Sequence, residues 1–423
     1  MDAFVFKGHI CDSIDRNHLR ILEHHYLVCE DGRCKGVFPT LPAAYAAVPV
    51  EDFGDRLIIP GLIDLHLHAP QFSFRGLGMD MELLDWLNTH TFPEESKYRD
   101  LAYAELAYSQ LTAHLIRSET TRACLFATVH VPATELLMEK LEKSGLITYV
   151  GKVNMNRNGP MYLIEPSTVE AVRQTRKWLS DTVGRFSRTK PIITPRFIPS
   201  CTDDLLYRLA DLRAEFGVPV QSHLSENLGE IAWVKELVPT AKNYGDAYRK
   251  FGLLGGDYPC IMAHCVHSDA LEMEYLKENG VFVAHSPESN MNIASGVAPV
   301  NRFLDYGIKV GLATDVAGGS HESMFKAMTH AIQASKLRWR LLDQSVAPLT
   351  FDTAFYLATR GGGAFFGKVG AFEEGFEMDA LVLDDSTLDH PQPLSVRERL
   401  ERFIYLGDER NLYAKVVGGR RLF

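Results

Sequence analysis

Eight apolar, β-rich runs recur along the middle of the chain, and each ends in polar residues before a helical stretch begins. In order they read LIIPGLIDLHLH, TTRACLFATV, LITYVGKVNMN, PIITPRFIP, VPVQSHLSEN, PCIMAHCVH, GVFVAHSPESN and IKVGLATDVAGG. Stretches between them, such as TELLMEKLEKSG and DALEMEYLKENG, space apolar residues three and four apart, as an amphipathic helix does. Eight such βα units favour a (β/α)8 TIM-like barrel. A doubly wound parallel sheet would show the same local alternation.

The two ends of the chain carry a different pattern. Residues 1–57 alternate short β-like runs with turn signals such as Asp31-Gly32, and residues 366–423 contain the strand candidates MDALVLDD and LYAKVVGGRRLF. We expect the two ends to form one small β-sandwich domain together, with residues 58–365 inserted between them as the catalytic barrel. The predicted fold class is therefore α/β, a (β/α)8 TIM-like barrel plus a β-sandwich domain built from both chain ends.

Composition excludes several classes of function. The chain has 423 residues, of which 46% are hydrophobic, so it can bury a large core. Its formal charge of -10, without a long Lys/Arg cluster, argues against nucleic acid or an anionic membrane as partner, and favours a small, roughly neutral substrate. The N-terminal residues lack a basic segment followed by an apolar core, and no apolar run has membrane-spanning length, so we expect a cytoplasmic protein. The seven scattered cysteines, an odd number without a C-x-x-C pair, indicate reduced thiols.

The first of the eight runs ends in two histidines, His66 and His68, separated by one leucine. Residues two apart on a strand point to the same face, so both imidazoles can reach one ion. In a (β/α)8 barrel the active site lies where the strands end, which is where these histidines stand. An isolated H-x-H is more often a pair of ordinary polar residues, and the other run ends decide between the two interpretations.

Four further runs also end in imidazole or carboxylate side chains: His223 with Glu226, then His264, His285 and Asp315. Each alone has an ordinary explanation, as a core histidine, a helix N-cap or a solvated residue of a first helical turn. Their joint occurrence at strand ends favours a convergent site. Three imidazoles and a carboxylate suit Zn²⁺ or Fe²⁺ and leave a position for water, whose pKa the metal lowers to about 7.

These residues resemble the signature of the amidohydrolase superfamily, which is PG-x-x-D-x-H-x-H on strand one, a His on strands five and six, and an Asp on strand eight. The matching residues are Pro60, Gly61, Asp64, His66, His68, His223, His264 and Asp315. Within the superfamily, the chain is similar to the guanine deaminase family over nearly its whole length. The similar segments are HAPQFSFRGLGMDMELLDWLNTHTFPEE, TPRFIPSCT, QSHLSENLGEIAWVKEL and GLATDVAGGSHESM.

The resemblance implies a metal-dependent hydrolase that converts guanine to xanthine and ammonia, and a set of roles for residues of this sequence. One zinc ion per chain, with Fe²⁺ as the alternative, would be held by His66, His68, His223 and Asp315. Catalysis would rest on Glu226 as proton shuttle, with Asp315 and His264 acting on the attacking water. The purine would contact Gln71, Arg196 and Phe197 together with His68, Ala69 and Pro70. The resemblance also implies a homodimer, and a structural role for Asp64.

Other interpretations stay open from the sequence. The same metal centre could serve another aminoheterocycle deaminase or a triazine-type hydrolase. A non-catalytic scaffold that kept the barrel is the alternative from a different class, although all expected ligands and Glu226 are present. Lys152, near the end of the third run, could bridge two metals as a carbamate. Since the resemblance is to the mononuclear branch, we interpret Lys152 as structural.

Overall fold

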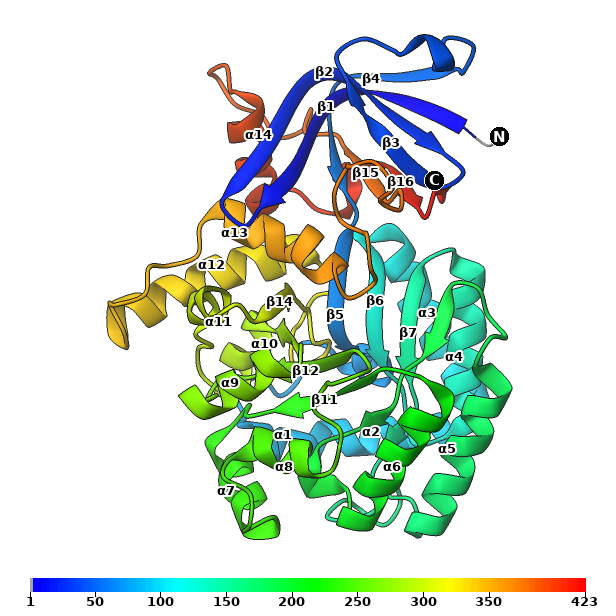
Figure 1. Ribbon diagram of the computed structural model, residues 1–423, viewed down its shortest axis with the longest axis vertical. Coiled ribbons are helices and arrows are strands. Elements are labelled where there is room, and N and C mark those ends of the chain that lie inside the picture. The colour runs from blue at the N-terminus through cyan, green and yellow to red at the C-terminus, as the bar shows by residue number, and fades with distance from the viewer. Residues whose placement is uncertain (1–2) are drawn as a thin grey trace.

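The eight predicted runs each supply one position of a parallel barrel, which forms the larger part of the computed structural model (Figure 1). The structure describes residues 3–423. The barrel strands are β5 (Leu62–His68), β6 (Thr120–Phe126), β7 (Ile147–Gly151) continued by β8 (Val153–Asn154), β9 (Thr189–Pro191) continued by β10 (Thr194–Pro195), β11 (Val220–Leu224), β12 (Cys260–His264), β13 (Phe282–His285) and β14 (Lys309–Leu312).

Hydrogen bonding closes these strands into a ring. Strands β5, β6, β7 and β9 pair in sequence order, as do β11 to β14, and a parallel bridge between Ile193 and Val220 joins the two groups. At the other side, the Asp315 N–H donates to the His66 carbonyl at 2.9 Å, and the His68 N–H donates to the Val316 carbonyl at 2.9 Å. The barrel is therefore confirmed, and the doubly wound sheet is excluded.

Helices surround the barrel as the amphipathic stretches predicted. In α4, for example, the buried side chains Leu137 and Leu141 face the core, and the helix ends at Gly145, whose positive φ of 84° suits glycine. The helices after successive strands are α3 (Leu101–Arg117), α4 (Val131–Ser144), α5 (Thr168–Thr182), α6 (Asp203–Phe216), α7 (Leu228–Leu237), α8 (Tyr244–Lys250), α9 (Ala270–Glu278), α10 (Pro287–Asn292), α11 (Val300–Tyr306) and α12 (Met324–Leu341).

Short helical segments cover the carboxyl ends of the strands. The segment after β5 is the longest of these covers, and it contains η2 (Ala69–Phe74), α1 (Leu83–Trp86), η3 (Leu87–Thr91), α2 (Phe92–Ser96) and η4 (Lys97–Arg99). Elsewhere the short helices are η1 (Ala43–Tyr45), η5 (Ile198–Ser200), α13 (Phe351–Tyr356), η6 (Leu357–Gly361), α14 (Val396–Leu406) and η7 (Glu409–Asn411). None of the helices within residues 3–423 has the length and apolar character that crossing a bilayer requires.

Both chain ends build the small β domain, as predicted, and both termini lie in it (Figure 1). Its strands are β1 (Ala3–Asp15), β2 (His18–Glu30), β3 (Arg33–Phe38), β4 (Val50–Pro60), β15 (Ala380–Leu383), β16 (Leu412–Val417) and β17 (Arg420–Arg421). They pair in the order β17-β16-β15-β4-β1-β2-β3. The sandwich is thus made from one continuous sheet, which encloses an apolar cluster containing Phe6, Leu27, Phe53, Met378 and Val416.

Strand β4 connects the two parts of the chain. It pairs in parallel with β1 between Val50 and Ile58, and antiparallel with β15 from Leu57 to Pro60. After Gly61, β5 begins the barrel. The boundary between residues 57 and 58 stays a prediction, because this strand continues through it.

A buried ion pair joins the barrel to the β domain. Arg122 on β6 donates from Nε to Asp379 Oδ2 at 2.6 Å and from Nη2 to Asp379 Oδ1 at 3.0 Å. The side chain of Arg122 is 2% exposed and that of Asp379 0%. The Gly418 N–H also donates to Asp379, at 2.7 Å. Arg122 also donates to the Glu377 carboxylate at 2.8 Å, whereas Asp379 has Arg122 as its charged partner.

Replacing Arg122 by Met should destabilise the protein by about 3–5 kcal/mol, because it leaves the Asp379 carboxylate buried without its partner. The exposed pair Arg421–Glu51 gives a matched control, since Arg421→Met should change stability by less than about 1 kcal/mol. Urea unfolding followed by circular dichroism measures both variants. Equal stability of Arg122→Met and Arg421→Met would contradict this role for the buried pair.

Candidate metal centre and substrate pocket

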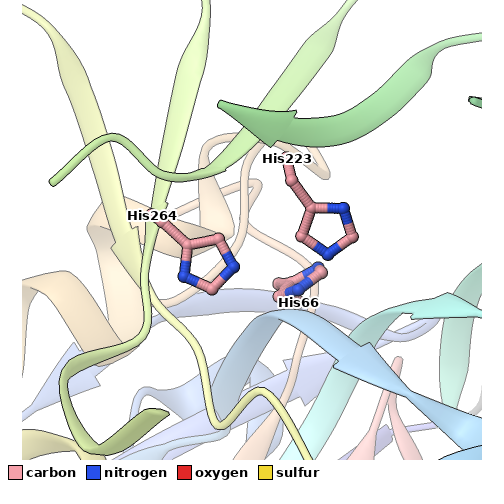
Figure 2. Close-up of side chains that lie close together, drawn as sticks. All are labelled: His66, His223 and His264. Atoms are coloured by element: carbon pink, nitrogen blue, oxygen red, sulfur yellow. The ribbon is translucent and has the colours of Figure 1, made fainter. Parts of the chain in front are cut away.

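Histidines from separate strands point toward one another at the carboxyl end of the barrel. Figure 2 shows His66, His223 and His264, which come from β5, β11 and β12, with their rings gathered around a common point. The His68 Nε2 lies 3.1 Å from the His223 Nε2. One oxygen of Asp315, which follows β14, lies 3.1 Å from the His66 Nε2 and 3.6 Å from the His68 Nε2. His66, His68 and Asp315 therefore lie within reach of one ion, and His223 lies beside His66 and His68.

The protonation state of this cluster suits metal binding. Burial lowers the pKa of His66, His68 and His223 well below the usual value, and the neighbouring imidazoles lower the pKa of His68 and His223 further. The His223 Nδ1 lies 2.5 Å from the Arg196 carbonyl, so it carries the hydrogen and leaves the Nε2 lone pair for a ligand bond. Among the described residues, both ring nitrogens of His66 lack a hydrogen-bond partner. Neutral imidazoles with unused lone pairs beside a carboxylate fit a divalent metal.

Asp64 positions the ligands from the first and last strands. Its carboxylate accepts from the N–H of Thr314 at 3.1 Å and of His66 at 3.2 Å, and from the Thr314 hydroxyl. Burial raises the pKa of Asp64 to about 7. Asp315, the residue after Thr314, has a positive φ of 49°, an uncommon conformation that aims its side chain at the cluster. These contacts support the structural role expected for Asp64.

Glu226 and His264 lie beside the proposed ligands. The Glu226 Oε2 lies 3.5 Å from the His264 Nε2, which is 3.7 Å from an oxygen of Asp315. The other ring nitrogen of His264 lies 2.9 Å from the Asn290 side-chain oxygen, to which it donates. Burial, and next the negative charge of Asp315, raise the pKa of Glu226 well above its usual value. A carboxyl group that holds a proton at neutral pH can transfer it to a substrate.

A cavity opens beside this cluster, with both polar and apolar side chains in its lining. Among the described residues its polar lining includes Gln71, Arg196, Glu226, His264 and Asp315, together with His68 and His223. The apolar lining is Leu83, Trp86, Leu87, Phe197 and Ile293. The predicted pocket residues Gln71, Arg196 and Phe197 thus share one cavity.

Ala69 and Pro70, which were also predicted to contact the substrate, do not line this cavity. Both residues are buried in η2, and neither is among the described residues that line the cavity. Their role in substrate binding stays a prediction.

Sequence reasoning missed the carboxylate of Glu95, which lies behind the polar edge of the cavity. Its Oε1 accepts from the Gln71 Nε2 at 2.9 Å, and its Oε2 accepts from Arg196 Nη1 at 2.7 Å. Glu95 belongs to the short helix α2, in a segment without a helical or strand period, and only its inclusion in the family-like segment WLNTHTFPEE pointed to the region. Leu83, Trp86 and Leu87 come from the same segment.

Two other places in the structure are less suitable for binding a metal. Lys152 is buried, and its ammonium group pairs with the Glu165 carboxylate. Glu165 also accepts from the Asn154 amide at 3.2 Å, so Lys152 belongs to a structural network. His9, His24 and Asp55 form a cluster on the β domain, but His24 and Asp55 are exposed. The Arg399 guanidinium donates to the Asp55 carbonyl at 2.7 Å and opposes a cation there. The cluster at the barrel end is the stronger metal site.

Comparison with known proteins agrees with this geometry. The amidohydrolase family profile matches residues 57–422. A guanine deaminase from Dictyostelium discoideum is 38% identical, covering 99% of this chain and 98% of that protein, and one from Mus musculus is 38% identical, covering 87% and 83%. The chain belongs to the guanine deaminase family of amidohydrolases. Members of the amidohydrolase family share the barrel and β domain found here.

Solved structures of other proteins share the fold of this chain. A guanine deaminase from C. acetobutylicum with bound guanine in its active site has a TM-score of 0.97 and 45% identity, over 100% of both chains. A triazine hydrolase from Arthobacter aurescens has a TM-score of 0.84 at 17% identity, over 100% of this chain and 94% of that one, which shows the fold alone.

The stability of the metal-free protein should fall as the pH falls below about 6.5. The unfolded chain then protonates its histidines, whereas His66, His68 and His223 stay neutral in the folded state because burial lowers their pKa. Each of these histidines should contribute up to about 1.4 kcal/mol per pH unit. Thermal unfolding of chelator-treated protein between pH 7 and 5 measures this slope, and His68→Asn should make it shallower. An unchanged slope in that variant would contradict the expected neutral state.

Proposed function

We propose that this protein hydrolyses guanine to xanthine and ammonia. The observation that carries the proposal is one cavity that combines a buried His/Asp cluster, the carboxyl group of Glu226 and the polar edge of Gln71 and Arg196. Support comes from the 45% identical structure that holds guanine in its active site. In this role the enzyme would act in purine breakdown, since its product is a deaminated purine.

One Zn²⁺ per chain is the proposed cofactor, with His66, His68, His223 and Asp315 as its ligands and Fe²⁺ as an alternative that accepts the same donor set. Both ring nitrogens of His66 lack a hydrogen-bond partner among the described residues, which supports this ligand set. When bound, the metal would lower the pKa of water to about 7 and so supply a nucleophile at neutral pH. Metal analysis of the purified protein identifies the ion.

The side chains around the cavity move the protons of the reaction. Asp315 lies 3.7 Å from the His264 Nε2 and, with its pKa raised mainly by burial, accepts a proton from the attacking water. As the water oxygen adds to C2 of guanine, Glu226 donates its proton to the ring nitrogen N3, which receives the electron pair. Glu226 then takes the proton of the new C2 hydroxyl and passes it to the C2 amino group, so that the C–N bond breaks, C2 becomes a carbonyl and ammonia leaves. The proton held by Asp315 finally returns to Glu226. His264, 3.5 Å from Glu226, stabilises the oxygen on C2.

The purine would be held by its polar edge and its ring faces. Arg196 donates through a rigid fork that suits the O6 and N7 acceptors, and the Gln71 amide offers both a donor and an acceptor. Phe197 and Trp86 give the cavity apolar walls for an aromatic ring. A base without matching groups would leave buried polar atoms unpaired, which is the physical basis of selectivity here.

A triazine-type hydrolase or another aminoheterocycle deaminase is the competing function, because the fold is shared with a triazine hydrolase. The paired Arg196 and Gln71 favour an oxo-purine over an alkylamino triazine. Ammonia release from guanine, adenine, cytosine, 8-oxoguanine and aminotriazines separates the candidates. Activity on an aminotriazine without activity on guanine would reject our choice.

The homodimer implied by the family resemblance and the cytoplasmic location expected from the sequence are also part of the proposal. Exposed apolar side chains such as Leu341 and Leu342, 73% and 67% exposed, support association with a second copy. Light scattering of the purified protein gives its mass in solution.

Replacing Glu226 by Gln should leave about one metal ion per chain and lower kcat by roughly 10² to 10⁴, because the amide cannot carry the proton. Xanthine formation from guanine, measured together with metal content, checks this result. Glu236→Gln, at an exposed position of α7, is the control and should keep wild-type kcat. Full activity of Glu226→Gln would remove Glu226 from the mechanism.

A further inference from the structure

Glu95 reaches the substrate pocket only through other side chains. It is 1% exposed and is not among the described residues that line the cavity. Both of its carboxylate oxygens are occupied, one by the Gln71 amide at 2.9 Å and the other by the Arg196 guanidinium at 2.7 Å. Gln71 and Arg196 are the two polar residues proposed to read the purine, so one buried carboxylate holds both of them.

These contacts fix the orientation of the Gln71 amide and of the Arg196 guanidinium. Because the Gln71 Nε2 donates to Glu95, the amide oxygen points the other way, where it accepts from the Ala317 N–H at 3.2 Å. Arg196 packs over the Phe92 ring, with its Cζ 5.2 Å from the ring centroid, and uses Nη1 for Glu95. The amide orientation and the guanidinium plane are thus set before a substrate enters.

The same contacts determine the charge of the pocket edge. The Arg196 side chain is 3% exposed and that of Glu95 2%, so neither charge is screened by water. A guanidinium alone at the cavity edge would attract an anion, whereas the pair has no net charge. The charge of Glu95 therefore decides whether this edge prefers a neutral or an anionic ring.

The substrate and the product of the proposed reaction differ in this property. Guanine is neutral near pH 7. Hydrolysis replaces its C2 amino group by a second carbonyl, and a ring N–H next to two carbonyls is more acidic than those of guanine. Xanthine therefore becomes anionic at a lower pH than guanine does.

We propose that Glu95 is a positioning residue that determines specificity by neutralising Arg196 and orienting Gln71, so that the pocket prefers a neutral purine and rejects the xanthine anion. This inference rests on the proposed function. Its consequence is weak product inhibition at alkaline pH, where an uncompensated arginine would retain the product.

Three variants test the proposal. Glu95→Gln keeps the shape of the side chain but removes its charge. Glu95→Asp keeps the charge and should restore wild-type behaviour in part. Glu94→Gln is the matched control, because Glu94 is the neighbouring buried glutamate of α2 and pairs instead with Lys97 at 2.6 Å and with Tyr103.

The measurement is the inhibition constant of xanthine and the KM of guanine between pH 6 and 9. In wild type and in Glu94→Gln, the inhibition constant should rise as xanthine ionises. In Glu95→Gln it should stay level or fall, ending on the order of tenfold or more below wild type at pH 9, because an uncompensated charge favours its counter-ion by at least that factor. The KM of guanine should change less than the inhibition constant.

Two results would overturn the proposal. One is a xanthine profile of Glu95→Gln that parallels the profile of Glu94→Gln. The other is wild-type enzyme that binds xanthine equally well or better as the pH rises, a result that decides the question even when Glu95→Gln does not fold. Failure of the proposed function is a separate outcome, since wild-type protein with a full metal complement would then release no ammonia from guanine.

Discussion

The contact between the first and last barrel strands is the constraint on which the rest of the site depends. His66 and His68 come from β5 and Asp315 follows β14, about 250 residues later, so a metal centre exists only where these two strands meet. Backbone hydrogen bonds join them, and the Asp64 carboxylate binds Thr314 across the junction. The ring of strands then brings His223 and His264 to the same end without further adjustment.

Desolvation governs how the charged groups of the site are arranged. The three proposed imidazole ligands remain neutral because burial opposes their protonation, and the same effect raises the pKa of Glu226. Arg196 and Glu95 do carry charges, but they cancel at 2.7 Å. Each buried group is therefore neutral or paired, and the space between them suits an uncharged aromatic ring beside a cation site. A bound metal would add its positive charge to this set of buried groups.

Side chains at strand ends could be predicted from the sequence pattern, whereas in the covering segment only residues of η2 were assigned, through the family resemblance. His66, His223 and Asp315 follow runs whose β character is plain, and barrel geometry brings such positions together whatever the intervening chain does. Glu95 sits in a five-residue helix, where its burial depends on Gln71 and Arg196 rather than on any local period. The same holds for Asn290 of α10, whose contact with His264 of β12 depends on the packing of two separate elements. The β domain was predicted from turn signals at both ends, but the union of its strands in one sheet depends on β4, which local patterns do not reveal.

The position of β4 in that sheet has a consequence for biosynthesis. Leu57 of β4 pairs with Leu383 of β15, so the partner strand leaves the ribosome only after the entire barrel has been made. Until then, one edge of β4 has open backbone donors and acceptors, a condition that invites pairing with other chains. The contacts of the β domain are among the longest in sequence separation, and loop-closure entropy makes such contacts slow to form. A ribosome-bound nascent chain that ends before residue 380 therefore carries all the proposed metal ligands on an incomplete sheet, and chaperone demand should be greatest at that stage.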